Sequence, residues 1–120
     1  MYQHVNHATM VTILEEARIP FLLAPFGDEI TTIGLLIAEV NIAYKAQLRL
    51  IDSPLQVTMW SKRVRAVDFT VGYEVRSVGA APDSRPAVIA ETQLAAVHIE
   101  EQRLQRLSAA QREYLQRWTR

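Results

Sequence analysis

The chain has 120 residues, which is enough for one domain with one hydrophobic core and too short for two. Its 13 lysines and arginines balance 13 aspartates and glutamates, so no net charge attracts it to nucleic acid or to an anionic membrane. The absence of cysteine excludes disulfides, thiolate nucleophiles and zinc–thiolate sites, and it fits a reducing compartment. We therefore expect a single domain over residues 1–120.

The sequence contains no recognisable targeting or membrane-spanning segment. Its first residues lack the basic-then-apolar pattern of a signal peptide. No apolar run approaches the roughly 20 residues needed to span a bilayer, and the longest, from Ile33 to Ala38, is followed by Glu39. These features predict a cytoplasmic protein with no nucleic-acid or membrane partner.

Residues 8–23 are expected to form the main helix. Asn6 is the expected N-cap, whereas Pro20 predicts an end or a kink near Ile19. Gly27-Asp28 is a turn signal after this helix. The apolar residues recur at intervals of three and four, as in a helix with one buried stripe: Met10, Val11, Ile13, Leu14, Ala17 and Phe21.

Four runs with the period of a strand follow the turn. The first ends at Tyr44, and alternation predicts one apolar face made of Leu36, Ala38, Val40, Ile42 and Tyr44. The second extends from Leu55 to Val67, and the same alternation puts Val57 and Met59 on one face and Trp60 and Val64 on the other. The third alternates strictly, with Phe69, Val71, Tyr73 and Val75 on its apolar face, and the fourth covers residues 87–99.

A capping-box pattern from Ser108 to Gln111 opens a short final helix that reaches Trp118. The order of helix, four strands and helix predicts an α+β sandwich, in which the long helix covers one face of an antiparallel sheet. We expect the opposite face of the sheet to be apolar and therefore to favour association, with Trp60 and Trp118 as candidate contacts between subunits.

The polar segment ahead of the main helix carries the candidate chemistry. Free backbone N–H groups at a helix start, together with the helix dipole, suit a developing oxyanion. An imidazole beside them can transfer a proton or polarise a carbonyl. His4 and His7 have the spacing of two metal ligands, but no third ligand is near, so no metal is expected. A simpler alternative is that Asn6 caps the helix and both histidines are ordinary loop residues.

Two motifs in this region resemble the signature of the 4-hydroxybenzoyl-CoA thioesterase family of hot-dog proteins. These are His4-Val5-Asn6-His7 and Glu15-Glu16-Ala17-Arg18, which stand in the register of the family, although Gln3 replaces the usual glycine. The similarity extends over nearly the whole chain, with further matches at Tyr44, Asp52, Asp68-Phe69 and Ala90-Glu91.

The resemblance implies a hot-dog fold, in which an antiparallel sheet wraps a central helix and two copies pair with active sites at their interface. It implies a homodimer or tetramer, an acyl-CoA substrate and no cofactor. The amide of His7 would polarise the thioester carbonyl, and the candidate catalytic side chains are His7 and Asn6. In this register the catalytic aspartate of the family falls immediately before Met1, and the family's first strand would precede it.

A basic cluster is the candidate site for the phosphates of coenzyme A, because guanidinium forks suit phosphate groups. It contains Lys62, Arg63 and Arg65, and strand alternation puts the two arginines on one face. The resemblance places Arg65 and Arg103 near these phosphates. The alternative is a solvated face that protects a strand edge.

Two further residues have structural interpretations. The spacing of Glu15 and Arg18 predicts an ion pair along the helix. His98 ends the last strand and is expected to be structural.

Together these features predict an acyl-CoA thioesterase that releases a free acid and coenzyme A. The position of the expected aspartate supports an alternative, a non-catalytic hot-dog module that binds acyl-thioesters or serves as an assembly subunit. The sequence contains no Gly-x-Ser-x-Gly elbow and no glycine-rich phosphate or dinucleotide loop, so serine hydrolase, kinase and dehydrogenase functions have no support.

Overall fold

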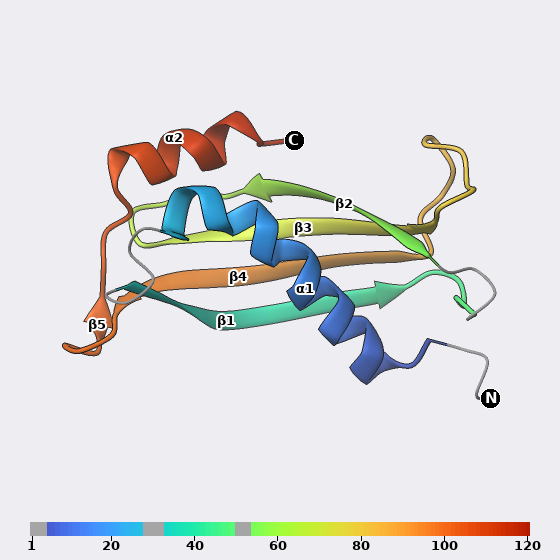
Figure 1. The fold of residues 1–120 in the computed structure, drawn as a ribbon, viewed down its shortest axis with the longest axis horizontal. Helices are drawn as coiled ribbons and strands as arrows, with labels where there is room; N and C mark the ends of the chain where they lie inside the picture. The colour runs from blue at the N-terminus through green and yellow to red at the C-terminus, as the bar shows by residue number, and fades with distance from the viewer. Residues whose placement is uncertain (1–4, 28–32, 50–53) are drawn as a thin grey trace.

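A computed structural model describes residues 5–27, 33–49 and 54–120. Figure 1 shows α1 lying diagonally across one face of an antiparallel sheet, with α2 beside it near β2. The α+β sandwich predicted from the sequence is confirmed. The elements in chain order are α1 (His7–Phe26), β1 (Ile33–Tyr44), β2 (Leu55–Lys62), β3 (Asp68–Ser77), β4 (Val88–His98), β5 (Arg103–Leu104) and α2 (Ala109–Arg117).

Helix α1 begins where the sequence predicts but continues past the expected end. The side chain of Asn6 caps it, and Oδ1 accepts a hydrogen bond of 2.9 Å from the amide of Thr9. The expectation that Pro20 ends the helix near Ile19 is wrong, because α1 continues to Phe26. Pro20 and Pro25 each remove one backbone donor and crowd the preceding turn, but the extra turns bury Leu22 and Phe26 in the core, which favours the longer helix.

The sheet has the strand order β1-β4-β3-β2, and the short β5, which the sequence did not predict, pairs with the end of β4. Its helix-facing surface is the core of the molecule. The predicted apolar face of β3 is confirmed, since all four of its side chains are 0% exposed. They lie opposite alternate residues of β4, and the paired residues are Phe69–Leu94, Val71–Thr92, Tyr73–Ala90 and Val75–Val88.

A β-bulge at Ala38 divides β1 into two halves of opposite phase. The register shifts between Ile37 and Glu39, so uninterrupted alternation does not hold along the strand. Beyond the bulge, Ile42 faces the core opposite the buried Ala90, whereas before it Leu36 lies on the other face of the sheet. The prediction of one continuous apolar face from Leu36 to Tyr44 is therefore wrong, because a bulge reverses the phase of every residue that follows.

Strand β2 is shorter than expected. Arg63 has a φ of 49°, in the left-handed region, which ends the strand at Lys62. Val64 therefore packs against the core and does not share a face with Trp60, contrary to the prediction. Trp60 does lie opposite the core face, where it covers Gly72. A Cβ atom at position 72 would come within 2.5 Å of the indole ring, so this close approach requires glycine.

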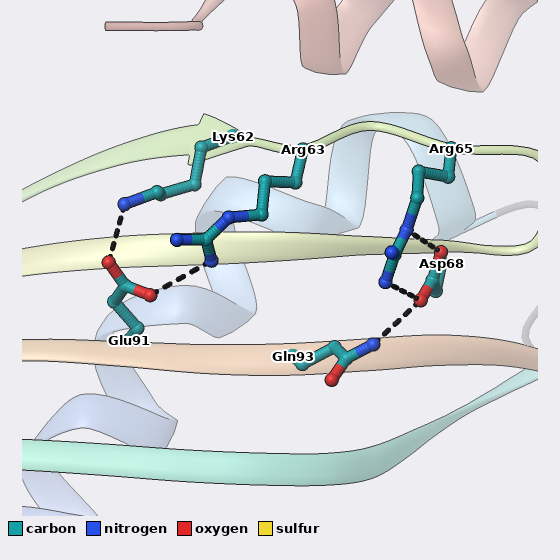
Figure 2. Close-up of polar contacts among 6 residues, drawn as sticks. All are labelled: Lys62, Arg63, Arg65, Asp68, Glu91 and Gln93. Carbon is teal, nitrogen blue, oxygen red and sulfur yellow. Dashed lines mark hydrogen bonds and ion pairs between the residues drawn. The ribbon is translucent and has the colours of Figure 1, made fainter.

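The face of the sheet away from α1 is mainly polar, and the apolar surface that the sequence predicted there is limited to side chains such as Leu36 and Ile89. Side chains on this face form ion pairs and hydrogen bonds between neighbouring strands (Figure 2). Other exposed apolar side chains lie along α1 and β1, where Leu23 and Val40 are 57% and 45% exposed. Leu36 lies on the mainly polar face and is 58% exposed. One buried face is enough for a sheet covered by one helix, so the alternate residues are free to be polar.

The C-terminal half follows the sequence prediction closely. Strand β4 begins and ends within one residue of the expected range. The predicted capping box of α2 is present, since Gln111 N donates to Ser108 Oγ and Ser108 N donates to Gln111 Oε1. Trp118 is half exposed just beyond α2. Within the part of the chain that the structure describes, no helix is both long and apolar enough to cross a membrane.

Candidate active site

The start of α1 meets the end of β1, and this contact positions the candidate catalytic histidine. Nδ1 of His7 lies 2.6 Å from the hydroxyl of Tyr44, and the two rings meet edge to face with centroids 5.8 Å apart. Partial burial raises the pKa of the Tyr44 hydroxyl, which therefore stays protonated near neutral pH. Whether the phenol donates to Nδ1 or accepts from it, the hydrogen bond holds the imidazole in one orientation.

A cavity of about 460 Å³ opens beside this pair. Its described lining comes from the start of α1, the end of β1 and the segment that follows β1. Apolar side chains such as Met10 and Val88 form one part of the wall, and Lys45 and Gln47 add polar groups. None of the described lining residues is an aspartate or glutamate. The cavity therefore combines a fixed imidazole with a mixed wall, but its described part carries no carboxylate.

The helix start beside this cavity also carries backbone donors. The first hydrogen bond of the helix is donated by Met10 N to Asn6 O. The amides of His7 and Ala8 precede it and donate to no described residue, so both can bind an oxygen atom that carries developing charge. Asn6 itself does not line the cavity, and its Oδ1 is occupied by the cap to Thr9. The side chain of Asn6 therefore stabilises the start of the helix and does not contact the cavity.

Three residues of the family-like motifs, Gln3, His4 and Asp52, lie outside the described residues. Arg18, from the second motif, does not form the predicted ion pair with Glu15. Its NH1 donates instead to the hydroxyl of Tyr73 at 3.2 Å. Packing directs the side chain of Arg18 toward the sheet. Its partner is therefore the buried phenol of Tyr73 and not the solvated carboxylate of Glu15.

The basic cluster lies on the polar face of the sheet, away from α1 (Figure 2). Lys62 and Arg63 both pair with Glu91, and Arg65 forms a two-pronged ion pair with Asp68. Arg63 and Arg65 line one shallow groove of about 220 Å³, so the sequence correctly put them on one side although no strand joins them. Because two carboxylates, Glu91 and Asp68, pair with the three cations, the cluster keeps a net charge of only +1.

The ion pair of Asp68 predicts a pH-dependent contribution to stability. Hydrogen bonds from Arg65 hold the pKa of this carboxyl below its ordinary value of 3.8, with a further contribution from Gln93. The depressed pKa means that the stabilisation is complete above pH 3.8 and is lost as the pH falls through the folded-state value. We expect Asp68→Asn to lower the free energy of unfolding by about 1 kcal/mol at pH 7, because Arg65 is well exposed.

Urea denaturation at pH 7 and pH 3 would measure this effect. The difference in the free energy of unfolding between the wild type and Asp68→Asn should be smaller at pH 3 than at pH 7. Asp83→Asn is the matched control, because Asp83 lies in an exposed loop and forms no ion pair with a described residue. An equal difference at both pH values would show that the ionised carboxylate is not the source of the stabilisation.

The two halves of the predicted site lie at opposite ends of the sheet. Tyr44, the partner of His7, lies opposite Val88, whereas Asp68, the partner of Arg65, lies opposite Ala95. Those two positions on β4 are seven residues apart, or about 24 Å at the usual rise of a strand. The structure therefore does not bring the arginines and His7 together within one chain.

Arg103 lies on the short β5, at the end of the sheet that carries Arg65, which we call the arginine end. It is paired with Glu101 and is exposed. His98, in the same region, accepts a hydrogen bond at Nδ1 from the amide of Glu101, as expected for a structural histidine in a turn. The three arginines predicted to bind phosphate thus lie toward one end of the sheet, although Arg63 and Arg65 are on the polar face and Arg103 belongs to a separate hairpin.

Sequence reasoning matched Tyr44 to the family pattern but gave it no role at the site. The one available signal was its position as the last residue of a strand that follows the helix. The pairing itself joins residues 37 positions apart, so local periodicity carries no information about it.

A long helix laid across one face of an antiparallel sheet is the arrangement of the hot-dog fold. The chain belongs to the thioesterase-like superfamily, whose family model matches residues 1–118. No curated protein matches it in sequence.

Solved structures share the fold at low sequence identity. The PA5185 protein of Pseudomonas aeruginosa strain PAO1 superposes with a TM-score of 0.84 at 15% identity, over 99% of this chain and 82% of that one. Slr0204, a 1,4-dihydroxy-2-naphthoyl-CoA thioesterase of Synechocystis, superposes with a TM-score of 0.73 at 16% identity, over 94% of this chain and 83% of that one. SAV2348 of Staphylococcus aureus, solved in complex with CoA, superposes with a TM-score of 0.80 at 12% identity, over 98% of this chain and 74% of that one. These similarities establish the hot-dog fold.

Proposed function

We propose that the protein is an acyl-CoA thioesterase that hydrolyses its substrate to a free acid and coenzyme A in the cytoplasm. The observation that carries this proposal is the contact between His7 and Tyr44, which fixes an imidazole beside a cavity and next to amides that donate to no described residue. Membership of the thioesterase-like superfamily supports the same reaction. No cofactor is needed for it.

Each group at the helix start has a distinct task in this proposal. The amides of His7 and Ala8 stabilise the oxyanion that forms when water attacks the thioester carbonyl. The imidazole of His7, oriented by Tyr44, removes a proton from the attacking water and gives it to the coenzyme A sulfur as the C–S bond breaks, which releases the free acid and the thiol. Asn6 supports the site by capping the helix, which keeps those amides in position.

We further propose that the active unit is a dimer formed by antiparallel pairing of β1 with its copy. β1 is a long edge strand with exposed apolar side chains, including Leu36 and Val40. The opposite edge, at β2, is partly covered, because Ser61 N donates to Trp118 O and Ser61 bridges to Thr119. The edge of β1 is therefore better suited to pair with a second subunit.

This dimer resolves the separation between the two halves of the predicted site. Antiparallel pairing places the Tyr44 end of one β1 beside the Ile33 end of the other. The arginine end of the partner then approaches the cavity at His7. Arg63, Arg65 and Arg103 are thus proposed to bind the phosphates of coenzyme A across the interface, where a 3′-phosphate would compete with the carboxylates for the guanidinium groups.

The experiment that tests the function is release of coenzyme A from a panel of acyl-CoAs, detected with a thiol reagent. The chain has no cysteine, so the reagent reports the product alone. The family pattern puts a catalytic aspartate immediately before Met1, and the described cavity has no carboxylate. The assay therefore compares the 120-residue chain with a version that carries this aspartate in an upstream extension.

Turnover by either form would support the proposal, and a large gain in the extended form would identify the aspartate as the nucleophile or base. The absence of a carboxylate from the described lining favours the second candidate, a hot-dog module that binds acyl-thioesters without turnover or serves as an assembly subunit. Tight acyl-CoA binding with no release from either form would establish binding without turnover and contradict the enzyme.

A further inference from the structure

A second cavity lies at the other end of α1, between this helix and β1. It is a groove of about 310 Å³, and its described walls are apolar side chains and glycines, with one exception. Leu22 and Phe26 of α1 face Leu35 of β1 and Leu94 of β4 across it. The residues at its mouth, such as Ile19 and Ile37, are well exposed. The groove thus has the size and apolar walls that suit a medium-length hydrocarbon chain.

The exception is Arg18, the one charged side chain among the described lining residues. Its NH1 donates to the hydroxyl of Tyr73, which is fully buried in the core. The guanidinium forms no ion pair within the described ranges, unlike Arg63, Arg65 and Arg76 on the polar face. A guanidinium held by a neutral phenol beside apolar walls keeps its positive charge and free N–H donors for an anionic ligand.

We propose that this groove holds the acyl group of the substrate and that Arg18 recognises a carboxylate at the far end of that group. This inference rests on the proposed function and specifies its substrate class, the mono-CoA thioester of a medium-chain dicarboxylic acid. Antiparallel pairing of β1 would bring the groove of one subunit, at the Ile33 end, beside the cavity of the partner, at the Tyr44 end. Tyr73 acts as a positioning residue that fixes the guanidinium.

The test compares two pairs of probes that differ only in a terminal carboxylate. For binding, these are coenzyme A thioethers that cannot be hydrolysed, one with an octyl chain and one with a 7-carboxyheptyl chain, titrated by calorimetry. For turnover, they are octanoyl-CoA and the mono-CoA thioester of octanedioic acid. The variants are Arg18→Met, which keeps the aliphatic stem, and Tyr73→Phe. Arg85→Met, on an exposed loop, is the matched control.

Arg18→Met is expected to weaken binding of the carboxylated thioether by about 10-fold to 100-fold and to change binding of the octyl thioether by no more than about threefold. Tyr73→Phe should weaken binding of the carboxylated thioether alone, by about threefold to 10-fold, because it frees the guanidinium without removing it. Arg85→Met should change neither. Equal effects of Arg18→Met on both thioethers, no effect on either, or failure of the wild type to bind them would overturn the inference.

The two readouts separate this inference from the proposed function. If no thioester releases coenzyme A but the thioethers show the expected pattern, the function fails and the recognition by Arg18 stands. If both thioesters are hydrolysed and Arg18→Met does not alter the ratio of their kcat/KM values, the function stands and the inference fails. Thermal unfolding of each variant shows whether a loss of binding reflects a loss of fold.

Discussion

Replacing His7 with alanine is expected to lower kcat/KM for acyl-CoA hydrolysis by about 100-fold or more, the usual contribution of a positioned acid–base group. Alanine keeps the backbone amide and favours the helix, so the amides at the start of α1 remain in place. The substitution therefore isolates the imidazole, which Tyr44 holds at 2.6 Å. Steady-state release of coenzyme A, measured on the form that shows turnover, is the test.

Two further variants test whether the loss of activity is specific to the oriented imidazole of His7. Tyr44→Phe keeps the ring but removes the hydroxyl that orients the imidazole, and we expect a smaller loss, about 10-fold and mainly in kcat. His98→Ala is the control, because this histidine only accepts a hydrogen bond in the turn after β4. It should leave the activity unchanged. Full activity in His7→Ala would mean that the imidazole takes no part in the reaction.

Phe69→Ala is expected to lower the free energy of unfolding by about 3–5 kcal/mol. The side chain of Phe69 is 0% exposed and stacks on Phe26, with ring centroids 5.7 Å apart and an angle of 15° between the rings. Alanine would leave a cavity where the extension of α1 past Pro20 packs against the start of β3. Since small domains have only about 5–15 kcal/mol of total stability, the variant would be close to unfolding.

Urea denaturation at a fixed protein concentration measures this loss, because dimer formation would make the midpoint depend on concentration. Val78→Ala is the matched control, a large-to-small change at a residue that is 59% exposed, and it should cost less than about 0.5 kcal/mol. A loss below about 1 kcal/mol for Phe69→Ala would show that the packing between the end of α1 and β3 contributes little to stability.

The elements that were predicted well are those governed by neighbours in the chain. The cap of Asn6 and the capping box of Ser108 join residues three positions apart, and the alternation of β3 follows from the pleat of a strand. Local backbone geometry sets both caps and this alternation. The family-like motif at the start of α1 needed only the order of residues.

The errors arose where distant contacts outweigh a local preference. Packing of Leu22 and Phe26 extends α1 beyond Pro20, and the bulge at Ala38 is visible only in the register with β4. The basic cluster looked like a positive surface in the sequence. Its net charge is only +1, because β3 and β4 supply the two carboxylates that pair with it, Asp68 and Glu91.

The sequence by itself determined the fold class, the family-like motif, the cap that starts α1 and the candidate His7, since these depend on residue order and short-range periodicity. Only the tertiary structure decided which residues act together. It joined His7 to Tyr44 across 37 positions and Arg18 to Tyr73 across 55, and it separated His7 from Arg65 by the length of the sheet. The physical reason is that contacts between distant residues depend on how the strands pair and how the helix packs, and that information is spread over the whole chain.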